Sequence, residues 1–379
     1  MAFPTLTLSG KLEHALSSGH PWIYRDHLPE NDLISGEWVL VQSGRARAFG
    51  LYDANSPIAL RLFGTQEPSS SLIQSRVVRA LELRKMVFDA STTAFRLIAG
   101  EGDFLPGITV DKYGRYAVVQ TYADCLEAVL PDVIAALSKS DLRLKGIVRR
   151  NDGELETLWG EAPPPEVTIL ENDLKIIANL YEGQKTGLFL DHRDNRALLG
   201  RLAKDMTVLN LFAYTGAFSL YAARGGASRV TSVDIAPAAM RDAARDFSLN
   251  GFDPELHEFV AADCFKLLED YVRDGKRFDL VILDPPSLAR SKDNRFAAAR
   301  AYKKLNVLAL KCVREGGLLA SASCTSQIGP DHFKEILLEA GLDTGRRLQI
   351  LQENGHAHDH PVPISFPEGR YLKFVLVRA

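Results

Sequence analysis

The fold is decided by the stretch Val208-Leu209-Asn210-Leu211-Phe212-Ala213-Tyr214-Thr215-Gly216-Ala217-Phe218. An apolar run breaks at a turn of small residues, a helical pattern follows, and a second apolar run ends at Ser232-Val233-Asp234. This order predicts a strand, a tight loop, a helix and a second strand. We expect Gly216 to let the backbone approach a ligand closely, because glycine has no Cβ. Asp234 follows Gly216 by 18 residues, near the spacing of about 20 at which an acid meets ribose hydroxyls in nucleotide-binding α/β folds.

Two glycine patterns that bind phosphate groups are absent from the sequence. It contains neither the dinucleotide pattern G-x-G-x-x-G nor the triphosphate pattern G-x-x-x-x-G-K-[ST]. A dehydrogenase is therefore disfavoured, and a nucleoside cofactor without a pyrophosphate fits better. S-adenosylmethionine is the common cofactor of that kind, and we expect it here.

The composition is typical of a globular protein with more than one domain. The chain has 379 residues, of which 46% are hydrophobic and 25% charged, and its formal net charge is −3. This charge excludes a chain that is basic throughout, but not a local basic surface for nucleic acid. No apolar run is long enough to span a bilayer, and the first residues lack a signal-peptide pattern. The four cysteines have no C-x-x-C spacing, which favours a reducing, cytoplasmic setting.

Three blocks with different patterns divide the sequence. Residues 1–66 carry short strand-like runs separated by Gly, Pro, Asn and Ser, which is typical of a small β-rich module. Residues 67–180 combine a capped helix, a strand meander, a helix over 125–138 and a hairpin that turns at 171–173. Residues 181–379 alternate strand-like runs with amphipathic helices. We therefore predict an α/β fold with a mostly parallel sheet that has helices on both faces.

Acidic residues end several strands of the third block, where ligands bind in sheets of this kind. Asp263 follows the apolar run that ends at Ala262, and is placed either to read an adenine or to cap the helix that follows. Asp284 follows a fully apolar strand, and Pro285 and Pro286 stiffen the chain just beyond it. A nucleobase edge could bond to an acid held in such a turn, which favours a binding role over a plain strand exit.

A thiol ends the next predicted strand. Because the two strands are consecutive, Cys324 and Asp284 can be neighbours. A thiolate that adds to C6 of cytosine turns the ring into an enamine, whose C5 can attack an electrophilic methyl group. An acid near N3 would stabilise the charge that develops. Cys125 and Cys312 lie in helical apolar patterns and are expected to fill cores, and Cys264 is expected to pack or to contact the backbone.

Three further segments carry polar or aromatic groups without deciding a role. Residues 184–193 mix a cation, a hydroxyl and an acid, and could close over a cofactor or serve as a connector. His356, His358 and His360 would share one face of a strand, but no acid or cysteine cluster completes a metal site. We therefore expect a loop near the substrate there. Residues 19–25 combine aromatic and basic side chains, which suits RNA stacking as well as packing.

With these residues in hand, the chain resembles the PUA-domain-containing class I methyltransferases of bacteria and archaea that make 5-methylcytosine in large-subunit ribosomal RNA. The likeness covers nearly the whole sequence. It rests on these stretches: Gly19 to Tyr24, Arg96 to Gly107, Gln184 to Arg193, Phe212 to Gly216, Asp284 to Pro286, Ser323-Cys324 and His360 to Lys373. The resemblance implies a PUA-like RNA-binding domain, a central α+β domain and a Rossmann-like methyltransferase domain with a seven-stranded sheet.

Particular residues gain roles from this resemblance. It implies that Cys324 is the nucleophile and Asp284 its partner on the base. It also implies that Asp234 and Asp263 hold the ribose and adenine of S-adenosylmethionine. The other cofactor contacts that it implies are Phe212, Tyr214, Thr215, Gly216, Cys264, Asp284, Pro285, Lys185, Asp191 and Arg193. The implied partner is large-subunit ribosomal RNA, with no metal and no membrane, and a homodimer is an open alternative to a monomer.

One departure from the family pattern leaves the target base open. Relatives often carry an aromatic residue soon after the two prolines, where this chain has Ser287-Leu288-Ala289-Arg290-Ser291-Lys292. Residues 187–193 and Ser291-Lys292 also resemble guanine-N7 ribosomal methyltransferases, which need no thiol. One alternative is therefore a nitrogen methyltransferase with Cys324 as a bystander, and another is a non-catalytic ribosome assembly factor. Cys324 and the PUA-like start favour cytosine.

Overall fold

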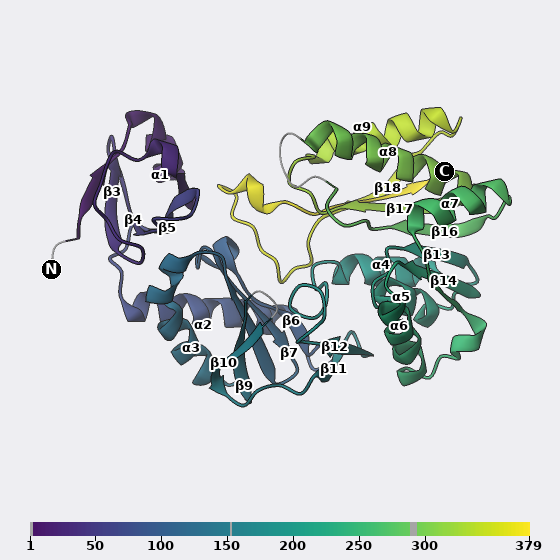
Figure 1. Cartoon of the computed structure of the whole chain (residues 1–379), viewed down its shortest axis with the longest axis horizontal. Helices are drawn as coiled ribbons and strands as arrows, with labels where there is room; N and C mark the ends of the chain where they lie inside the picture. The colour runs from purple at the N-terminus through teal and green to yellow at the C-terminus, as the bar shows by residue number, and fades with distance from the viewer. Residues whose placement is uncertain (1–2, 152–153, 289–293) are drawn as a thin grey trace. The chain divides into compact units, whose positions relative to one another are not determined.

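The computed structural model describes residues 3–151, 154–288 and 294–379 (Figure 1). Chain contacts divide the protein into two compact units. Unit 1 comprises Met1–Leu170, Ala178–Leu190 and His358–Gly369, and unit 2 comprises Glu171–Ile177, Asp191–Ala357 and Arg370–Ala379. The domain bounds at residues 66 and 180 stay predictions. Most of the departure from the family pattern, residues 289–292, lies outside the described residues.

Unit 1 begins with a five-stranded sheet. Its strands in spatial order are β1 (Thr5–Thr7), β3 (Trp38–Ser43), β4 (Ala46–Tyr52), β5 (Ile58–Gly64) and β2 (Trp22–Tyr24). β4 pairs antiparallel with β3 and β5, whereas β1 runs parallel to β3. Every second residue of β3 is buried, because one face of this strand covers a core that also takes Leu16 of α1 (Glu13–Ser18). The β-rich pattern predicted for the first block is confirmed.

A second five-stranded sheet follows in unit 1. Its order is β10 (Glu154–Gly160), β9 (Gly146–Asn151), β8 (Tyr116–Thr121), β7 (Ile108–Tyr113) and β6 (Ala94–Ala99), and α2 (Ser70–Val87) and α3 (Leu130–Ser138) share its apolar core. Ser69 caps α2 by accepting a hydrogen bond from the Leu72 N–H at 3.2 Å. The single helix predicted over 125–138 is wrong. A 3-10 helix (Asp124–Ala128) precedes α3, because Pro131 in the first turn of α3 cannot continue an earlier helix.

The predicted hairpin is confirmed between β11 (Glu166–Glu171) and β12 (Leu174–Asn179). Asn172 and Asp173 at its turn have φ values of 48° and 66°. Asn and Asp tolerate this left-handed conformation better than most residues that carry a Cβ. The turn chemistry of the sequence therefore suffices to place this hairpin.

Unit 2 is built on a seven-stranded sheet. Its strands in spatial order are β15 (Glu258–Ala261), β14 (Arg229–Asp234), β13 (Thr207–Leu211), β16 (Phe278–Leu283), β17 (Val313–Ser323), β19 (Lys373–Arg378) and β18 (Gln349–Asn354). The first five run parallel, and β19 is antiparallel to both of its neighbours. The order reverses between β13 and β16, and α/β sheets bind ligands beside such a switch point.

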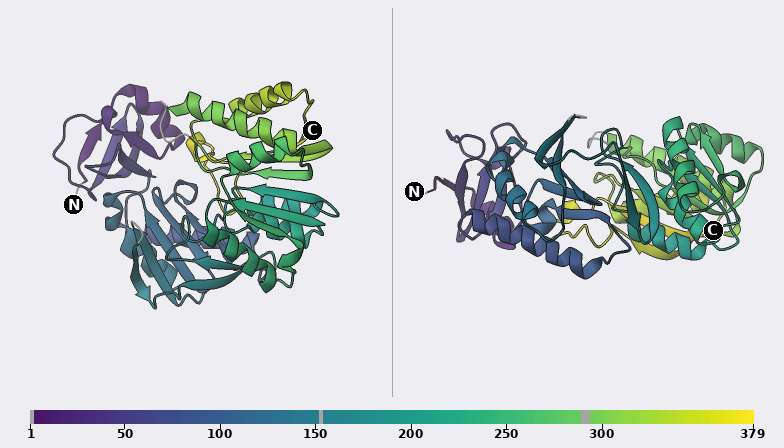
Figure 2. Two further views of the ribbon diagram at one scale, coloured as in Figure 1. Left: turned by 45° about the vertical axis from the view of Figure 1, so that its right-hand side comes forward. Right: turned by 90° about the horizontal axis from the view of Figure 1, so that it is seen from below.

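Helices cover both faces of this sheet (Figures 1 and 2). α5 (Ala217–Arg224) contacts α4 (Arg193–Leu202) and α6 (Pro237–Leu249), and α8 (Arg295–Cys312) contacts α7 (Cys264–Arg273) and α9 (Pro330–Asp343). The predicted α/β fold class is confirmed. β18 was not predicted, because most of its residues are exposed and an edge strand needs no apolar pattern.

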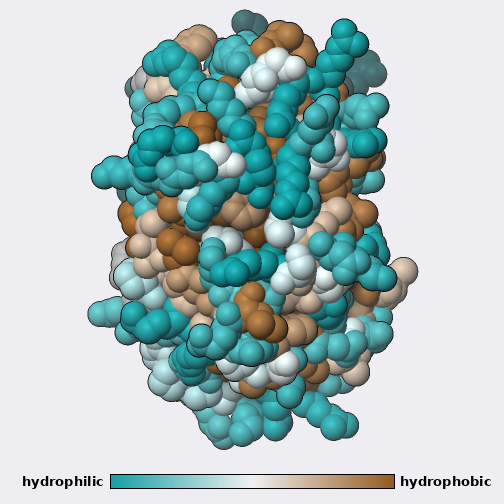
Figure 3. Space-filling view, turned by 90° about the vertical axis from the view of Figure 1, so that its right-hand side faces the viewer, coloured by the Kyte–Doolittle hydropathy of each residue, from teal (hydrophilic) through white to brown (hydrophobic). Residues whose placement is uncertain are grey.

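Short connections and the surface complete the fold. The other 3-10 helices span Gly10–Leu12, Arg25–His27, Gly100–Asp103, Pro254–Leu256 and Pro367–Gly369. Within the described ranges, none of the helices combines the length and the apolar character needed to cross a membrane. The face drawn in Figure 3 carries polar and charged side chains over much of its area, with apolar side chains interspersed.

Candidate active site

The carboxyl ends of the parallel strands meet at one edge of the sheet in unit 2. The register pairs Leu211 of β13 with Val233 of β14 and with Leu283 of β16. It also pairs Leu283 with Ser321 of β17. The residues that follow these positions therefore lie along the same edge. They are residues 212–216, Asp234, Asp284 and Cys324.

Residues 212–216 form a tight loop between β13 and α5. Phe212, Tyr214 and Gly216 have φ values of 58°, 49° and 75°. Left-handed backbone is costly for aromatic residues, and such strain is often found at binding sites. The loop is held from β14, because the Val233 carbonyl accepts a hydrogen bond from the Ala213 N–H at 2.9 Å.

Gly216 is also required for packing. A Cβ built on Gly216 would lie 2.9 Å from the Cβ of Ala243 in α6. Its side of the backbone thus faces a neighbouring helix, and glycine is needed there for packing and for its positive φ. Close approach of a ligand to the Gly216 backbone stays a prediction.

Asp234 organises the end of β14. One carboxylate oxygen accepts a hydrogen bond from the Tyr214 N–H at 2.9 Å, and the other accepts one from the Ala236 N–H at 3.0 Å. Asp234 is half-buried, whereas the next residue, Ile235, is 72% exposed. An exposed apolar side chain beside a fixed acid suits the ring and ribose of a nucleoside. The sequence reasoning missed Ile235, although its apolar character at a strand end was the available signal.

Asp263 and Cys264 lie at the start of α7. Asp263 is exposed, and one of its oxygens caps the helix by accepting hydrogen bonds from the N–H groups of Phe265 and Lys266. The capping role that the sequence allowed is therefore present. Cys264 is buried, its sulfur accepts a hydrogen bond from the Phe212 N–H at 3.3 Å, and burial raises its pKa to about 12. The expectation of packing and backbone contact is confirmed for Cys264.

Asp284 faces a histidine that the sequence reasoning had not singled out. Nε2 of His192 lies 3.4 Å from a carboxylate oxygen of Asp284. The His192 side chain is 4% exposed, whereas that of Asp284 is 25% exposed. Burial lowers the pKa of His192, but the carboxylates of Asp284 and Asp191 outweigh burial and raise that pKa above its ordinary value. His192 can thus orient Asp284 while leaving part of the carboxylate open to a ligand.

The orientation of His192 is set from its other side. Nδ2 of Asn195 lies 3.1 Å from Nδ1 of His192 and also donates to the Gly355 carbonyl at 3.2 Å. Oδ1 of Asn195 accepts a hydrogen bond from Asn354, which fixes the direction of the amide. Phe218 and Phe374 contact the imidazole edge-on. In the neutral ring Nδ1 is then the acceptor, so Nε2 carries the proton that faces Asp284.

Cys324 is half-buried directly after β17. The neighbouring phenol of Tyr302 in α8 is fully buried, and burial raises the pKa of Tyr302 to about 12. The charges of Cys324 and Asp284 both raise that pKa further, although less than burial does. Both groups therefore act on the same buried phenol, as expected if the thiol and the acid converge at this edge.

The segment 184–193 divides between the two units. Lys185 belongs to unit 1, where its ammonium lies 5.8 Å from the centre of the Phe189 ring and its carbonyl accepts a hydrogen bond from Arg150. Asp191 and Arg193 belong to unit 2 and are buried. Asp191 accepts a hydrogen bond from the Tyr371 hydroxyl at 2.7 Å, and Nε of Arg193 lies 3.4 Å from the Glu171 carboxylate. These contacts hold each part of the segment within its own unit, and cofactor contacts of the three residues stay predictions.

The three histidines also separate along the chain. His356 is half-buried in unit 2, where its Nε2 accepts a hydrogen bond from the Leu372 N–H at 3.2 Å. His358 is exposed and His360 is buried, and both belong to unit 1. Within the described residues, no group of three His, Cys, Asp or Glu side chains could hold a metal ion.

Two known domain families match separate parts of the chain. A PUA-like domain matches residues 6–65, and the S-adenosylmethionine-dependent methyltransferases match residues 106–351. The chain belongs to the S-adenosylmethionine-dependent methyltransferase family. The resemblance seen in the sequence is thereby confirmed.

Relatives of this methyltransferase match along nearly their whole length. The ribosomal RNA large subunit methyltransferase I of Pseudoalteromonas translucida is 36% identical, covering 97% of either chain. The protein of the same name from Klebsiella pneumoniae is 36% identical, covering 98% of this chain and 97% of its own. The crystal structure of SMU.776 complexed with SAH has a TM-score of 0.90 at 26% identity and covers 100% of both chains.

S-adenosylmethionine is the cofactor of this methyltransferase, as predicted. The edge described above fits it. Oγ1 of Thr215 is buried and has no hydrogen-bond partner among the described residues, so a polar ligand could satisfy it. Asp234 and Asp263 offer carboxylate oxygens, and Ile235 offers an apolar surface, at the ends of adjacent strands. Such a set suits a ribose and an adenine better than it suits a phosphate.

Proposed function

We propose that this methyltransferase forms 5-methylcytosine in large-subunit ribosomal RNA, with Cys324 as the nucleophile. The observation that carries the proposal is a half-buried thiol at the strand end next to Asp284, whose carboxylate is partly exposed. A methyltransferase that acts on a nitrogen needs no thiol there. The name shared by the full-length relatives supports the substrate class.

The mechanism follows from the chemistry of the cytosine ring. The Cys324 thiolate adds to C6, and the electrons of the C5–C6 double bond make C5 nucleophilic. Bound S-adenosylmethionine would supply the electrophilic methyl group, which C5 would take as the methyl–sulfur bond breaks and S-adenosylhomocysteine leaves. Loss of the C5 proton to a base then restores the double bond and expels the thiolate. Asp284, oriented by His192, would give a proton to N3 as the thiolate adds, which neutralises the charge that develops on the ring, and would take that proton back when the thiolate leaves.

Cofactor binding is assigned to the loop 212–216 and the neighbouring strand ends. Asp234 would hold the ribose hydroxyls, and Asp263 the adenine edge, beside the apolar side chain of Ile235. Thr215 would donate its hydroxyl to the polar end of the cofactor. Phe212, Tyr214 and Pro285 would line the same site. Isothermal titration of an Asp234→Ala variant with S-adenosylmethionine tests this assignment, and unchanged affinity would contradict it.

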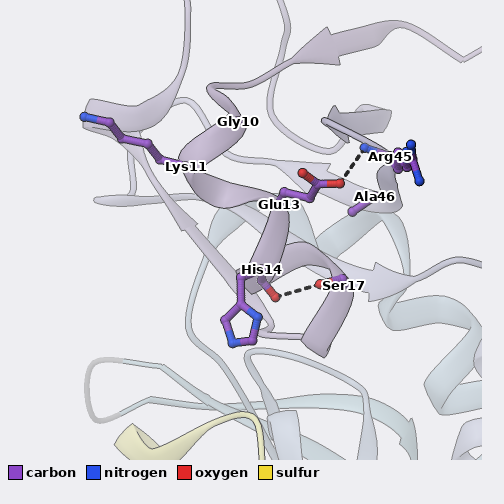
Figure 4. A pocket seen from close by; sticks show the side chains of 7 residues that line it. All are labelled: Gly10, Lys11, Glu13, His14, Ser17, Arg45 and Ala46. Carbon is purple, nitrogen blue, oxygen red and sulfur yellow. Dashed lines mark hydrogen bonds between the residues drawn. The ribbon is translucent and has the colours of Figure 1, made fainter.

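RNA contact is assigned to the first sheet of unit 1. A hollow of about 560 Å³ lies there between Gly10, Lys11, Glu13, His14, Ser17, Arg45 and Ala46 (Figure 4). Lys11, His14 and Arg45 are exposed, and Glu13 accepts a hydrogen bond from the Arg45 N–H at 2.8 Å. Exposed cations around a hollow suit phosphate groups of RNA.

The deciding experiment transfers a tritiated methyl group to unmodified ribosomal RNA and identifies the labelled nucleoside. We expect label in 5-methylcytidine. Label in guanosine or adenosine would contradict the thiol mechanism and support the nitrogen methyltransferase. An absence of label on RNA and on ribosomal particles would contradict the proposed substrate.

A trapping experiment tests the covalent step separately. RNA that carries 5-fluorocytosine should remain bound to the protein after denaturation, because fluorine cannot leave C5 as the proton does. Cys324→Ala should abolish the adduct. Cys125→Ala, which removes a buried thiol from unit 1, is the control and should retain it. An adduct with Cys324→Ala would contradict the role of this thiol.

Two finer predictions accompany the proposal. A cytoplasmic setting is expected, because the substrate is ribosomal RNA. The choice between monomer and homodimer can be made by sedimentation of the full chain with and without RNA. A sedimentation coefficient that depends on protein concentration would favour the homodimer.

A further inference from the structure

Lys373 is a buried lysine at the catalytic edge of the sheet. It begins β19 and pairs in register with Ser323, the last residue of β17. Its ammonium donates hydrogen bonds to the carbonyl of Thr325 and, at 2.8 Å, to the carbonyl of Tyr371. The side chain thus reaches past Cys324 and holds the residue that follows it. Lys373 is only 4% exposed.

The charge of Lys373 has an unusual environment for a buried lysine. Buried lysines are generally paired with a carboxylate, yet none of the carboxylates in the described ranges lies within ion-pair distance of Lys373. Burial lowers the pKa of Lys373 to about 8, and the Cys324 thiol acts in the opposite direction and raises it. An anion at Cys324 would therefore stabilise the ammonium, and the ammonium would stabilise that anion equally.

Other titratable groups are near this pair. The Tyr302 phenol from α8 is acted on by the charge of Cys324, and the Tyr371 hydroxyl donates to Asp191 in the segment before α4. The phenol of Tyr302 keeps its proton through the physiological range, because its pKa is raised to about 12 by burial. Asp191 raises the pKa of His192, although less than Asp284 does. Lys373 is then a cation placed to act on the thiol.

We propose that Lys373 is a positioning residue that keeps Cys324 as a thiolate and fixes the backbone on which the thiol is carried. This inference rests on the proposed nucleophilic role of Cys324. A lysine beside a cysteine favours the thiolate, and the thiolate is the form that adds to a pyrimidine. The two carbonyl bonds give the ammonium a fixed place, so its charge is present before the RNA binds.

A second lysine provides a matched control. Lys112 in β7 of unit 1 is half-buried, and burial lowers its pKa to about 8 as well. Its ammonium donates to the Thr93 carbonyl at 3.2 Å and lies over the Phe95 ring. Lys112 thus resembles Lys373 in its lowered pKa and in having a carbonyl partner, but it is less buried and belongs to the other unit. Removing it imposes a similar structural change without touching the thiol.

The test measures how fast iodoacetamide alkylates Cys324 in the full chain without RNA, from pH 6 to 10. Mass spectrometry of the Cys324 peptide gives the rate at each pH. We expect Lys373→Met to shift the half-maximal rate by about one pH unit upward, with roughly a tenfold slower rate at pH 7. Lys373→Arg keeps the positive charge and should shift the profile less. Lys112→Met should leave the profile unchanged.

The inference fails if the Lys373→Met and wild-type profiles coincide while thermal unfolding shows that both proteins are folded. Should Lys373→Met not fold, the wild-type profile still decides. We expect its midpoint below that of an ordinary thiol, about 8.5, and a midpoint at or above that value would contradict the inference.

The outcome is separable from that of the proposed function. A Lys373-dependent profile without any adduct on 5-fluorocytosine RNA would retain the thiolate site and reject the cytosine chemistry. An adduct that forms equally well with Lys373→Met and wild type would retain the cytosine chemistry and reject the role of Lys373.

Discussion

The second sheet of unit 1 and the carboxyl edge of the sheet in unit 2 both bury charged side chains, but they give them different partners. In unit 1, two nitrogens of Arg84 bond the two oxygens of Asp103 at 2.6 and 2.8 Å. Both side chains are at most 5% exposed. At the catalytic edge, Lys373 bonds two carbonyls, and a quarter of the Asp284 side chain stays exposed.

The two arrangements differ in whether a charged atom stays accessible to a ligand. A buried charge matched atom for atom by its partner stabilises one conformation and has nothing more to offer. A carboxylate held from one side only, as Asp284 is held by His192, keeps an open oxygen whose charge a substrate can use. Substitutions in the two regions should therefore separate stability from catalysis.

The largest effect is expected at Asp284. Asp284→Asn keeps the shape but removes the carboxyl group that is proposed to protonate the cytosine ring, so single-turnover methyl transfer at saturating cofactor should fall by about 10²- to 10⁴-fold. The midpoint of thermal unfolding should stay within a few degrees of wild type. If Asp284→Asn unfolded at a clearly lower temperature but transferred methyl at the wild-type rate, Asp284 would contribute to stability and not to catalysis.

In unit 1, the variant to compare with Asp284→Asn is Arg84→Met. It leaves the buried Asp103 carboxylate without its cation, and we expect the free energy of unfolding to fall by about 3–5 kcal/mol. Urea titration measures this loss, and the folded fraction should keep its rate of methyl transfer. Lys85→Met is the matched control on the same helix. It breaks an exposed pair with Asp141 and should change the free energy of unfolding by less than about 1 kcal/mol.

A smaller effect is expected for two histidines of unit 2, whose contributions to the stability of the fold depend on pH with opposite signs. The pKa of His192 is raised in the folded protein, because nearby carboxylates outweigh its burial. Its contribution to stability is therefore complete below its unfolded pKa of about 6.5 and is lost as the pH rises through the folded pKa. Urea titrations from pH 5 to 9 should show this loss in wild type and not in His192→Asn.

His257 should behave in the opposite way. Burial and the charge of Arg229 lower the pKa of His257, so its contribution is present above about pH 6.5 and is lost as the pH falls through the folded pKa. His257→Asn should remove that loss at low pH. Equal slopes for the two variants would contradict the assignment of His192 to a carboxylate partner.

The smallest effect is expected at the hollow of the first sheet. The double variant Lys11→Ala, Arg45→Ala should weaken binding of ribosomal RNA fragments by about tenfold at physiological salt. It should also reduce the slope of log affinity against log salt by about 2, one for each cation removed. Filter binding at several salt concentrations measures both. An unchanged slope would place the RNA contact elsewhere.

Much of the fold was predictable, because its signals are local. The apolar run 207–212 and the helix 217–224 appear as β13 and α5 at nearly the expected residues. The Asn172-Asp173 turn selects its own backbone conformation. The two elements that were predicted wrongly or not at all also have local causes. The helix expected over 125–138 crosses Pro131, and β18 has too little apolar pattern to be recognised.

The sequence indicated the strand-end residues of the candidate site but not the residues behind them. Asp234, Asp284 and Cys324 follow apolar strands, which is a signal that one sequence carries. His192 and Lys373 are far from them along the chain and show no such pattern. Gly216 stood out as a glycine, but its close contact with Ala243 depends on how α6 packs.

The sequence by itself determined the alternation of strands and helices, the absence of phosphate-binding glycine patterns, and the placing of acids and a thiol at strand ends. Periodicity and turn chemistry act over a few residues, so one chain is enough to show them. Only the tertiary structure decided that His192 orients Asp284 and that Lys373 bonds the carbonyl next to Cys324. These pairs depend on the register of strands that are distant in sequence, and no local pattern fixes that register.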